Sequence, residues 1–143
     1  QLCDMLKGLL PVAAILILQY NSIISLDKFL VYYVAFASIV GHDFSVFLKF
    51  KGGKGVNTTL GASILLTPFA VLISVLVYFL VKWRTNYVSL GSICLAISLP
   101  LISLLLQNLS LSFYYLLAAS LLIIVMHIPN IRRLIQGTEN RSK

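Results

Sequence analysis

The chain alternates between long apolar runs and short polar breaks. Each run has the length of a helix, and none shows the alternation of apolar and polar residues that is typical of a membrane β-strand. Because hydrocarbon offers no hydrogen-bond partner to a backbone amide, a segment inside a bilayer must be helical. The pattern therefore predicts an all-α, polytopic integral membrane helix bundle. The expected runs are Leu9–Tyr20, Phe29–Val40, Thr58–Val81, Val88–Leu106 and Leu109–Ile128.

The third run, Thr58–Val81, is interrupted by Thr67 and Pro68. A proline lacks a backbone donor and disfavours continuation of a helix. A break at this point leaves Thr58–Leu66, which at about 1.5 Å per residue is too short to cross a bilayer. We therefore expect a short re-entrant or half-depth helix here, followed by a complete span.

Charged residues are few, and most of them are basic. The 143 residues include 11 Lys+Arg and 4 Asp+Glu, 59% are hydrophobic, and the formal net charge is +7. So few charges exclude an ordinary soluble domain, and basic residues in short loops between spans are better explained by membrane topology than by nucleic-acid binding. If the third run is split, every basic residue except Lys28 falls on one side, which the positive-inside rule makes the cytoplasm.

A glycine- and lysine-rich loop after the second run is the best candidate for chemistry. It reads Gly52-Gly53-Lys54-Gly55, and a helix is expected to begin shortly after it, at Thr58. Glycines let backbone N–H groups turn toward one anion, the lysine adds a positive charge, and a helix N-terminus favours an anion at the same place. We interpret the loop as a phosphate-binding site, with a flexible basic loop on lipid head groups as the alternative.

Two other kinds of site fit the sequence poorly. A nucleotide P-loop requires Ser or Thr directly after the lysine, where this chain has Gly55. Cys3 and Cys94 are far apart and have no partners at metal-ligand spacing, so no metal site is expected.

Four segments match, in order, the signatures of one family. They are the Asp-x-x-Lys-Gly-x-x-Pro segment Asp4–Pro11, the glycine–lysine segment Gly41–Gly61, the serine-bearing segment Tyr87–Ile93, and His127–Glu139, which follows His-x-x-Asn-Ile-x-Arg-Leu-x-x-Gly-x-Glu. In these segments the chain closely resembles the bacterial membrane glycerol-3-phosphate acyltransferases of the PlsY type. The resemblance implies transfer of an acyl group from acyl phosphate to the 1-hydroxyl of sn-glycerol 3-phosphate, giving lysophosphatidate for phospholipid synthesis. It implies neither a metal nor a coenzyme.

The resemblance also implies roles for individual residues. The four loop residues match the family's substrate-phosphate loop, and Ser92 matches its active-site serine, with Ser89 a weaker candidate. A helix serine that donates to the carbonyl four residues back is the alternative for Ser92. The expected catalytic residues are Lys54, Ser92, His127 and Asn130, and the expected phosphate-binding residues are Gly52, Gly53, Lys54 and Gly55.

Four further residues are expected to support the site. His42 and Asp43 lie where the second run ends in a predicted turn, and we expect them to position the loop, with proton transfer as the alternative. Arg133 is expected to pair with Glu139 or to bind the substrate phosphate. For Glu139 itself, a structural salt bridge is the alternative to a chemical role.

The resemblance finally implies a setting for the protein. Family members carry a first signature on two further N-terminal spans, after which this chain starts, so residues 1–143 are expected to form a single transmembrane domain from the C-terminal part of a larger acyltransferase, impaired or inactive alone. The expected partners are glycerol 3-phosphate, acyl phosphate and membrane lipid, with no nucleic acid and no obligate protein partner. The expected location is the bacterial inner (plasma) membrane, with the active-site loops and the C-terminus cytoplasmic. The alternative function is a small membrane transporter or channel subunit for a phosphorylated solute.

Overall fold

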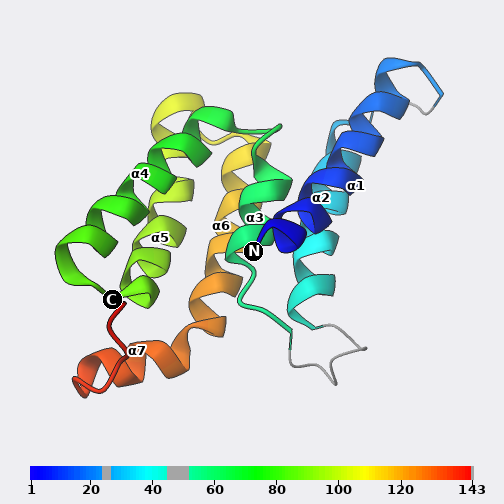
Figure 1. The fold of residues 1–143 in the computed structure, drawn as a ribbon. Coiled ribbons are helices and arrows are strands. Elements are labelled where there is room, and N and C mark those ends of the chain that lie inside the picture. Colours follow the sequence, from blue (N-terminus) through cyan, green and yellow to red (C-terminus); the bar gives the residue numbers. More distant parts are fainter. Residues whose placement is uncertain (24–26, 45–51, 143) are drawn as a thin grey trace. The chain divides into compact units, whose positions relative to one another are not determined.

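The protein is all-α in the part of the chain that the structure describes. A computed structural model describes residues 1–23, 27–44 and 52–142, and no strand occurs among them. The predicted fold class is therefore confirmed. The helices are α1 (Leu2–Tyr20), α2 (Lys28–Asp43), α3 (Val56–Ser63), α4 (Pro68–Thr85), α5 (Val88–Gln107), α6 (Leu111–Met126) and α7 (Ile128–Ile135) (Figure 1).

The chain divides into two compact units at the start of α4. The first unit is Gln1–Pro68 and contains α1, α2 and α3, whereas the second is Phe69–Lys143 and contains the remaining helices. Each unit has its own packed interior. The expectation of a single transmembrane domain stays a prediction.

Within the described residues, three helices are long and apolar enough to cross a membrane. These are α1, α4 and α5, and the bent pair of α6 and α7 is a fourth candidate. The predicted split of the third run is confirmed, because α3 ends at Ser63 and α4 begins at Pro68. The backbone N–H of Thr67 donates to the Ser63 carbonyl at 2.8 Å, which closes the turn between them. The half-depth position of α3 in the bilayer stays a prediction.

Close helix contacts in the first unit depend on two glycines. A Cβ atom on Gly8 of α1 would collide with the Thr58 carbonyl of α3, and a Cβ on Gly61 of α3 would collide with the Met5 carbonyl of α1. Small residues of this kind let two helix backbones approach closely. The short helix α3 is therefore held against α1 by backbone-to-backbone contact.

Three predicted helix boundaries in the first unit are wrong. Helix α1 begins at Leu2, well before Leu9, because Asp4 and Lys7 pair on its exposed side at 2.9 Å and do not interrupt it. The predicted turn after the second run is helical, and α2 extends through Asp43. Helix α3 begins at Val56, before the predicted Thr58, because Gly55 adopts a left-handed conformation (φ 70°) directly before it.

The second unit is built on the contact between α5 and α6. Leu95 and Leu99 of α5 and Leu116 and Ile123 of α6 are at most 1% exposed and form its interior. A Cβ atom on Gly91 would lie 2.9 Å from the Tyr78 ring of α4, so this glycine allows the close approach of α4 and α5.

The C-terminal segment folds back within the second unit. Helix α7 ends at Ile135, and Gly137 (φ 69°) follows its C-cap, with the N–H of Thr138 donating to the Arg133 carbonyl at 2.9 Å, the arrangement of a Schellman motif. The N–H of Ser142 then donates to the Asn86 carbonyl at 2.7 Å. The tail thus runs from α7 to the turn between α4 and α5 (Figure 1).

Candidate active site

The glycine loop of the first unit lies directly against the end of α2. The N–H of Gly52 donates to the backbone carbonyl of Asp43 at 3.2 Å. A Cβ atom on Gly52 would collide with the carbonyls of His42 and Asp43, and one on Gly53 would collide with the His42 ring. A Cβ on Gly55 would lie 2.8 Å from Oδ2 of Asp43. Each of the three loop glycines therefore contacts the last two residues of α2.

These contacts give the loop glycines a role that sequence reasoning missed. The sequence suggested that glycines free the loop amides for an anion. The structure shows that they also make room for the end of α2, and that the N–H of Gly52 is already used by Asp43. No local pattern in the sequence indicates that these glycines contact His42 and Asp43, which lie about ten positions earlier.

The N-terminus of α3 supplies the anion-favouring part of the loop. Gly55 occupies the N-cap position and offers no side-chain cap, and the first intrahelical bond runs from the N–H of Thr59 to the Gly55 carbonyl at 2.8 Å. The first-turn amides before Thr59 have no intrahelical acceptor, because an α-helix always leaves its first N–H groups without one. Lys54, directly before Gly55, is exposed. Helix dipole, amides and lysine together suit an anion.

The environment of Asp43 is the unexpected feature of this site. Its side chain is completely buried, and neither carboxylate oxygen accepts a hydrogen bond in the described part of the chain. Asp43 is the last residue of α2, beyond the apolar run that ends at Val40 and outside the three helices suited to cross a membrane. Burial raises the pKa of this carboxyl to about 6. A group that titrates near neutral pH therefore lies beside the N-terminus of α3.

Charged residues connect the end of α2 to α1. Nδ1 of His42 lies 3.8 Å from Oδ1 of Asp4, and the same oxygen accepts a 2.9 Å hydrogen bond from Lys7. Because the other edge of the His42 ring faces Gly53, this imidazole links α1 to the loop. The structure thus places His42 and Asp43 where the sequence expected them, against the loop.

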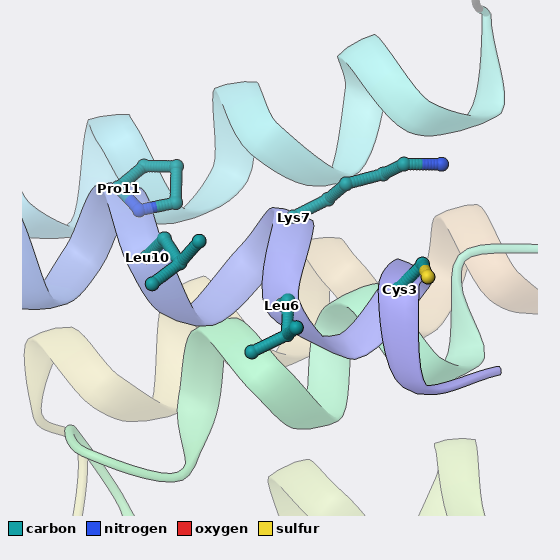
Figure 2. Close-up of a pocket in the computed structure, with 5 residues that line it drawn as sticks. All are labelled: Cys3, Leu6, Lys7, Leu10 and Pro11. Atoms are coloured by element: carbon teal, nitrogen blue, oxygen red, sulfur yellow. The ribbon is translucent and has the colours of Figure 1, made fainter.

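A hollow on the surface of α1 is not part of this site. It is lined by Cys3, Leu6, Lys7, Leu10 and Pro11, all from one helix (Figure 2). Its walls are apolar apart from Lys7, whose side chain points away from Leu10 and Pro11 and pairs with Asp4 (Figure 2). The hollow therefore offers no cluster of polar groups that would bind a phosphate.

The second unit contains an acid–amide–arginine cluster. Oε1 of Glu139 accepts a hydrogen bond from the Asn130 side chain at 2.6 Å, and Oε2 accepts one from Nε of Arg133 at 2.6 Å. The hydrogen bond from Asn130, followed by that from Arg133, lowers the pKa of Glu139 to about 2. The nearby Ser89 hydroxyl contributes to this shift, although its Oγ makes no hydrogen bond. Of the two expectations for Glu139, the salt bridge is present.

The two serines of α5 differ in their hydrogen bonds. Oγ of Ser92 donates to the Val88 carbonyl at 3.0 Å, which is the bond to the residue four positions back that the sequence left open. Its hydrogen is engaged there, and its lone pairs can still accept. Oγ of Ser89 is buried and has no partner among the described residues. Because the Ser89 hydroxyl helps to lower the pKa of Glu139, this serine belongs with the acid–amide–arginine cluster.

His127 lies at the bend between α6 and α7. The two helices meet at an angle of 57°, and the imidazole is only 2% exposed. Nδ1 lies 2.8 Å from the Ile123 carbonyl. A carbonyl can only accept, so Nδ1 carries the proton and neutral His127 has its lone pair on Nε2. Pro129 falls in the first turn of α7, where proline is tolerated.

These features define a class of protein: a helical membrane protein with a loop suited to bind an anion in one unit and a polar cluster in the other. The model of the family described as glycerol-3-phosphate acyltransferase matches residues 1–137. The chain belongs to this family, as the motifs predicted.

Individual relatives agree with this assignment. The chain is 41% identical over 140 residues to a glycerol-3-phosphate acyltransferase of Syntrophotalea carbinolica, covering 98% of this chain and 69% of the relative. It is 38% identical over 142 residues to one of Fusobacterium nucleatum subsp. nucleatum, with 98% and 69% covered. The alternative of a transporter or channel subunit is not favoured by these names.

Two solved structures share the fold. The crystal structure of PlsY (YgiH), an integral membrane glycerol 3-phosphate acyltransferase, in its glycerol 3-phosphate form has a TM-score of 0.85 and 34% identity, covering 98% of this chain and 68% of that one. Its lysophosphatidic acid form has a TM-score of 0.84 and covers 96% and 68%. The expectation of an integral membrane protein is thereby confirmed, whereas the side on which the loops and the C-terminus lie stays a prediction.

Proposed function

We propose that the protein transfers a fatty acyl group from acyl phosphate to the 1-hydroxyl of sn-glycerol 3-phosphate. The observation that carries the proposal is the Gly52–Gly55 loop, which presents Lys54 and an uncapped helix N-terminus. The chain is also 34% identical to an acyltransferase whose structure was solved with glycerol 3-phosphate. Products are lysophosphatidate and inorganic phosphate, and the reaction feeds phospholipid synthesis at the bacterial plasma membrane, with the reacting loops on the cytoplasmic side.

In this proposal the loop binds the phosphate of glycerol 3-phosphate. The amides at the start of α3 donate to its oxygens, and Lys54 neutralises its charge. Binding the phosphate fixes the distance from the loop to the glycerol hydroxyls. Recognition and orientation of the acceptor are therefore the functions we assign to the first unit.

The chemical step is a direct acyl transfer. The 1-hydroxyl oxygen forms a bond to the acyl carbonyl carbon, the bond from that carbon to the phosphate oxygen breaks, and inorganic phosphate leaves with the bonding electrons. Acyl phosphate is already activated, so positioning and electrostatic stabilisation are sufficient without an enzyme nucleophile. The hydroxyl proton passes either to Nε2 of His127 or to the substrate's own phosphate.

The second unit carries the other residues that the family resemblance assigns to the reaction. Glu139 holds the Asn130 amide with a 2.6 Å hydrogen bond, which fixes the side chain for contact with a substrate oxygen. Ser92 contributes a hydroxyl oxygen that can accept. The second carboxylate oxygen of Glu139 accepts a hydrogen bond from Arg133, which holds the acid in place beside Asn130.

Acyl transfer by the protein reconstituted in lipid vesicles tests the proposal. Lysophosphatidate is measured by mass spectrometry with acyl phosphate or acyl-coenzyme A as donor, and only acyl phosphate should support its formation. Lys54→Ala should lower kcat/KM for glycerol 3-phosphate by about 10- to 100-fold, because a hydrogen bond to a charged group contributes about 1.5–3 kcal/mol. Lys82→Ala, which removes a lysine from the last turn of α4, is the matched control and should leave kcat/KM unchanged. Equal rates for the two variants would remove the loop from the mechanism.

A further inference from the structure

Asp43 places a carboxyl group beside the N-terminus of α3, where we propose that the substrate phosphate binds. Its Oδ2 lies 2.8 Å from the position of a Cβ atom on Gly55, the N-cap of α3. The side chain is completely buried and no described donor reaches either oxygen. An ionised carboxylate in such a place has lost its hydration without gaining a hydrogen bond from a described donor, and the positive end of α3 compensates it in part.

A bound phosphate would be stabilised by the same positive end of α3 that stabilises the Asp43 carboxylate. Both anions are attracted to the first-turn amides of α3, and two like charges about 4–6 Å apart disfavour each other's ionised forms. Among the described residues, the other titratable groups on the segments around Asp43 are His42 in α2, Asp4 and Lys7 in α1, and Lys54 in the loop. Helix α3 itself contributes no titratable side chain. Among these groups Asp43 is the acid that directly borders Gly55.

We propose that Asp43 is a positioning residue that couples phosphate binding at the loop to the uptake of one proton. With the loop empty at neutral pH, the carboxylate is ionised and lies at the N-terminus of α3. When a phosphate dianion binds there, a proton from solvent adds to Asp43, and the neutral carboxyl becomes a donor in place of a second anion. The inference rests on the proposed role of the loop, and it adds a pH dependence which that role alone does not require.

The sign of the effect follows from the pKa of Asp43. Burial raises this pKa to about 6, and a phosphate beside the carboxyl raises it further. Below pH 6 the proton is already present, so phosphate binding meets no opposing charge. Above pH 6 binding must recruit the proton, and affinity falls as pH rises until the bound-state pKa is passed. A further rise of about one pKa unit corresponds to about a tenfold loss of affinity.

Calorimetric titration with glycerol 3-phosphate, and separately with inorganic phosphate, measures this coupling between pH 5 and pH 8. The variant is Asp43→Asn, which keeps the shape of the side chain and cannot ionise. The ratio of wild-type to variant Kd should be close to one at pH 5 and reach about tenfold at pH 8. The titration of the ligand phosphate, like that of any group other than Asp43, occurs in both proteins and cancels in this ratio.

Asp27→Asn is the matched control. Asp27 is the exposed N-cap of the same helix, so the variant removes one carboxylate from the other end of α2 while asparagine preserves the cap. Its Kd should follow the wild-type curve at every pH. A wild-type to Asp43→Asn ratio that is constant from pH 5 to pH 8 would overturn the coupling.

Two further measurements keep the outcome decisive. If circular dichroism shows that Asp43→Asn does not fold, wild-type protein is titrated at pH 7 in two buffers of different ionisation heat. Binding should then show net proton uptake, and the absence of uptake refutes the proposal. If wild-type protein binds neither ligand at any pH, the role of the loop fails together with the coupling. A constant ratio with intact phosphate binding refutes only the coupling.

Discussion

Gly55→Ala offers the sharpest test of how the loop is held. Gly55 has φ 70°, a left-handed conformation that costs a residue with a Cβ atom about 1–2 kcal/mol. The new Cβ would also lie 2.8 Å from Oδ2 of Asp43, closer than real Cβ contacts occur, and 3.0 Å from Oδ1, which is tighter than most of them. Because Asp43 is completely buried, its carboxylate cannot move aside without disturbing its neighbours.

A second glycine separates these two contributions. Gly137 has φ 69°, yet a Cβ atom there would have no heavy atom within 4 Å. Gly137→Ala therefore imposes the same backbone strain without the collision, and we expect it to lower the free energy of unfolding by about 1–2 kcal/mol. Gly55→Ala should cost at least about 1 kcal/mol more, since overpacking of a buried site typically adds about 1–3 kcal/mol.

The assay is reversible unfolding in mixed micelles of increasing sodium dodecyl sulfate, followed by circular dichroism. Asp43→Ser, which shortens the side chain, should recover part of the additional loss when combined with Gly55→Ala. Equal destabilisation by the two alanine variants, or no recovery in the double variant, would show that the end of α2 does not hold the loop in the way described.

Two other predictions concern helix packing and the C-terminal cluster. Gly61→Ala should destabilise the first unit in the same unfolding assay, because its Cβ would collide with the backbone of α1. Gly41 lies in open space within α2, so Gly41→Ala should stabilise the unit by about 0.5–1 kcal/mol. The reverse order of stabilities would contradict the packing described. The pKa of Glu139 is lowered from 4.5 to about 2, so its contribution to stability is fully present above about pH 4.5 and is lost as pH falls toward 2. Glu139→Gln should therefore be less stable than wild type at neutral pH, with the difference shrinking toward pH 2, and a difference independent of pH would exclude this origin.

The sequence predicted well those features that depend on local composition. Apolar runs located the helices, and the polar pair Thr67-Pro68 correctly separated α3 from α4. Signature motifs identified the family, and the Arg133–Glu139 pairing was among the anticipated possibilities. In each case the signal lies in neighbouring residues or in a fixed motif.

Features that depend on tertiary contact were not predicted. Polar residues near the start of α1 suggested a later beginning, because a pattern of hydropathy cannot register that Asp4 and Lys7 pair on an exposed side of the helix. The need for glycine at positions 52, 53 and 55 arises from the end of α2, and only the folded chain brings these segments together. Likewise, complete burial of Asp43 follows from packing around it, since the sequence shows only an acid after an apolar run.

The tail of the second unit has a consequence for biosynthesis. The turn between α4 and α5 is contacted by residues more than fifty positions later, since Nε of Arg141 donates to the Tyr87 hydroxyl at 3.2 Å and the N–H of Ser142 reaches Asn86. Because helices are synthesised and inserted in order, α4 and α5 enter the membrane before the contacts from Arg141 and Ser142 to the turn between them can form. Maturation of the second unit can finish only after residue 142 has emerged from the ribosome.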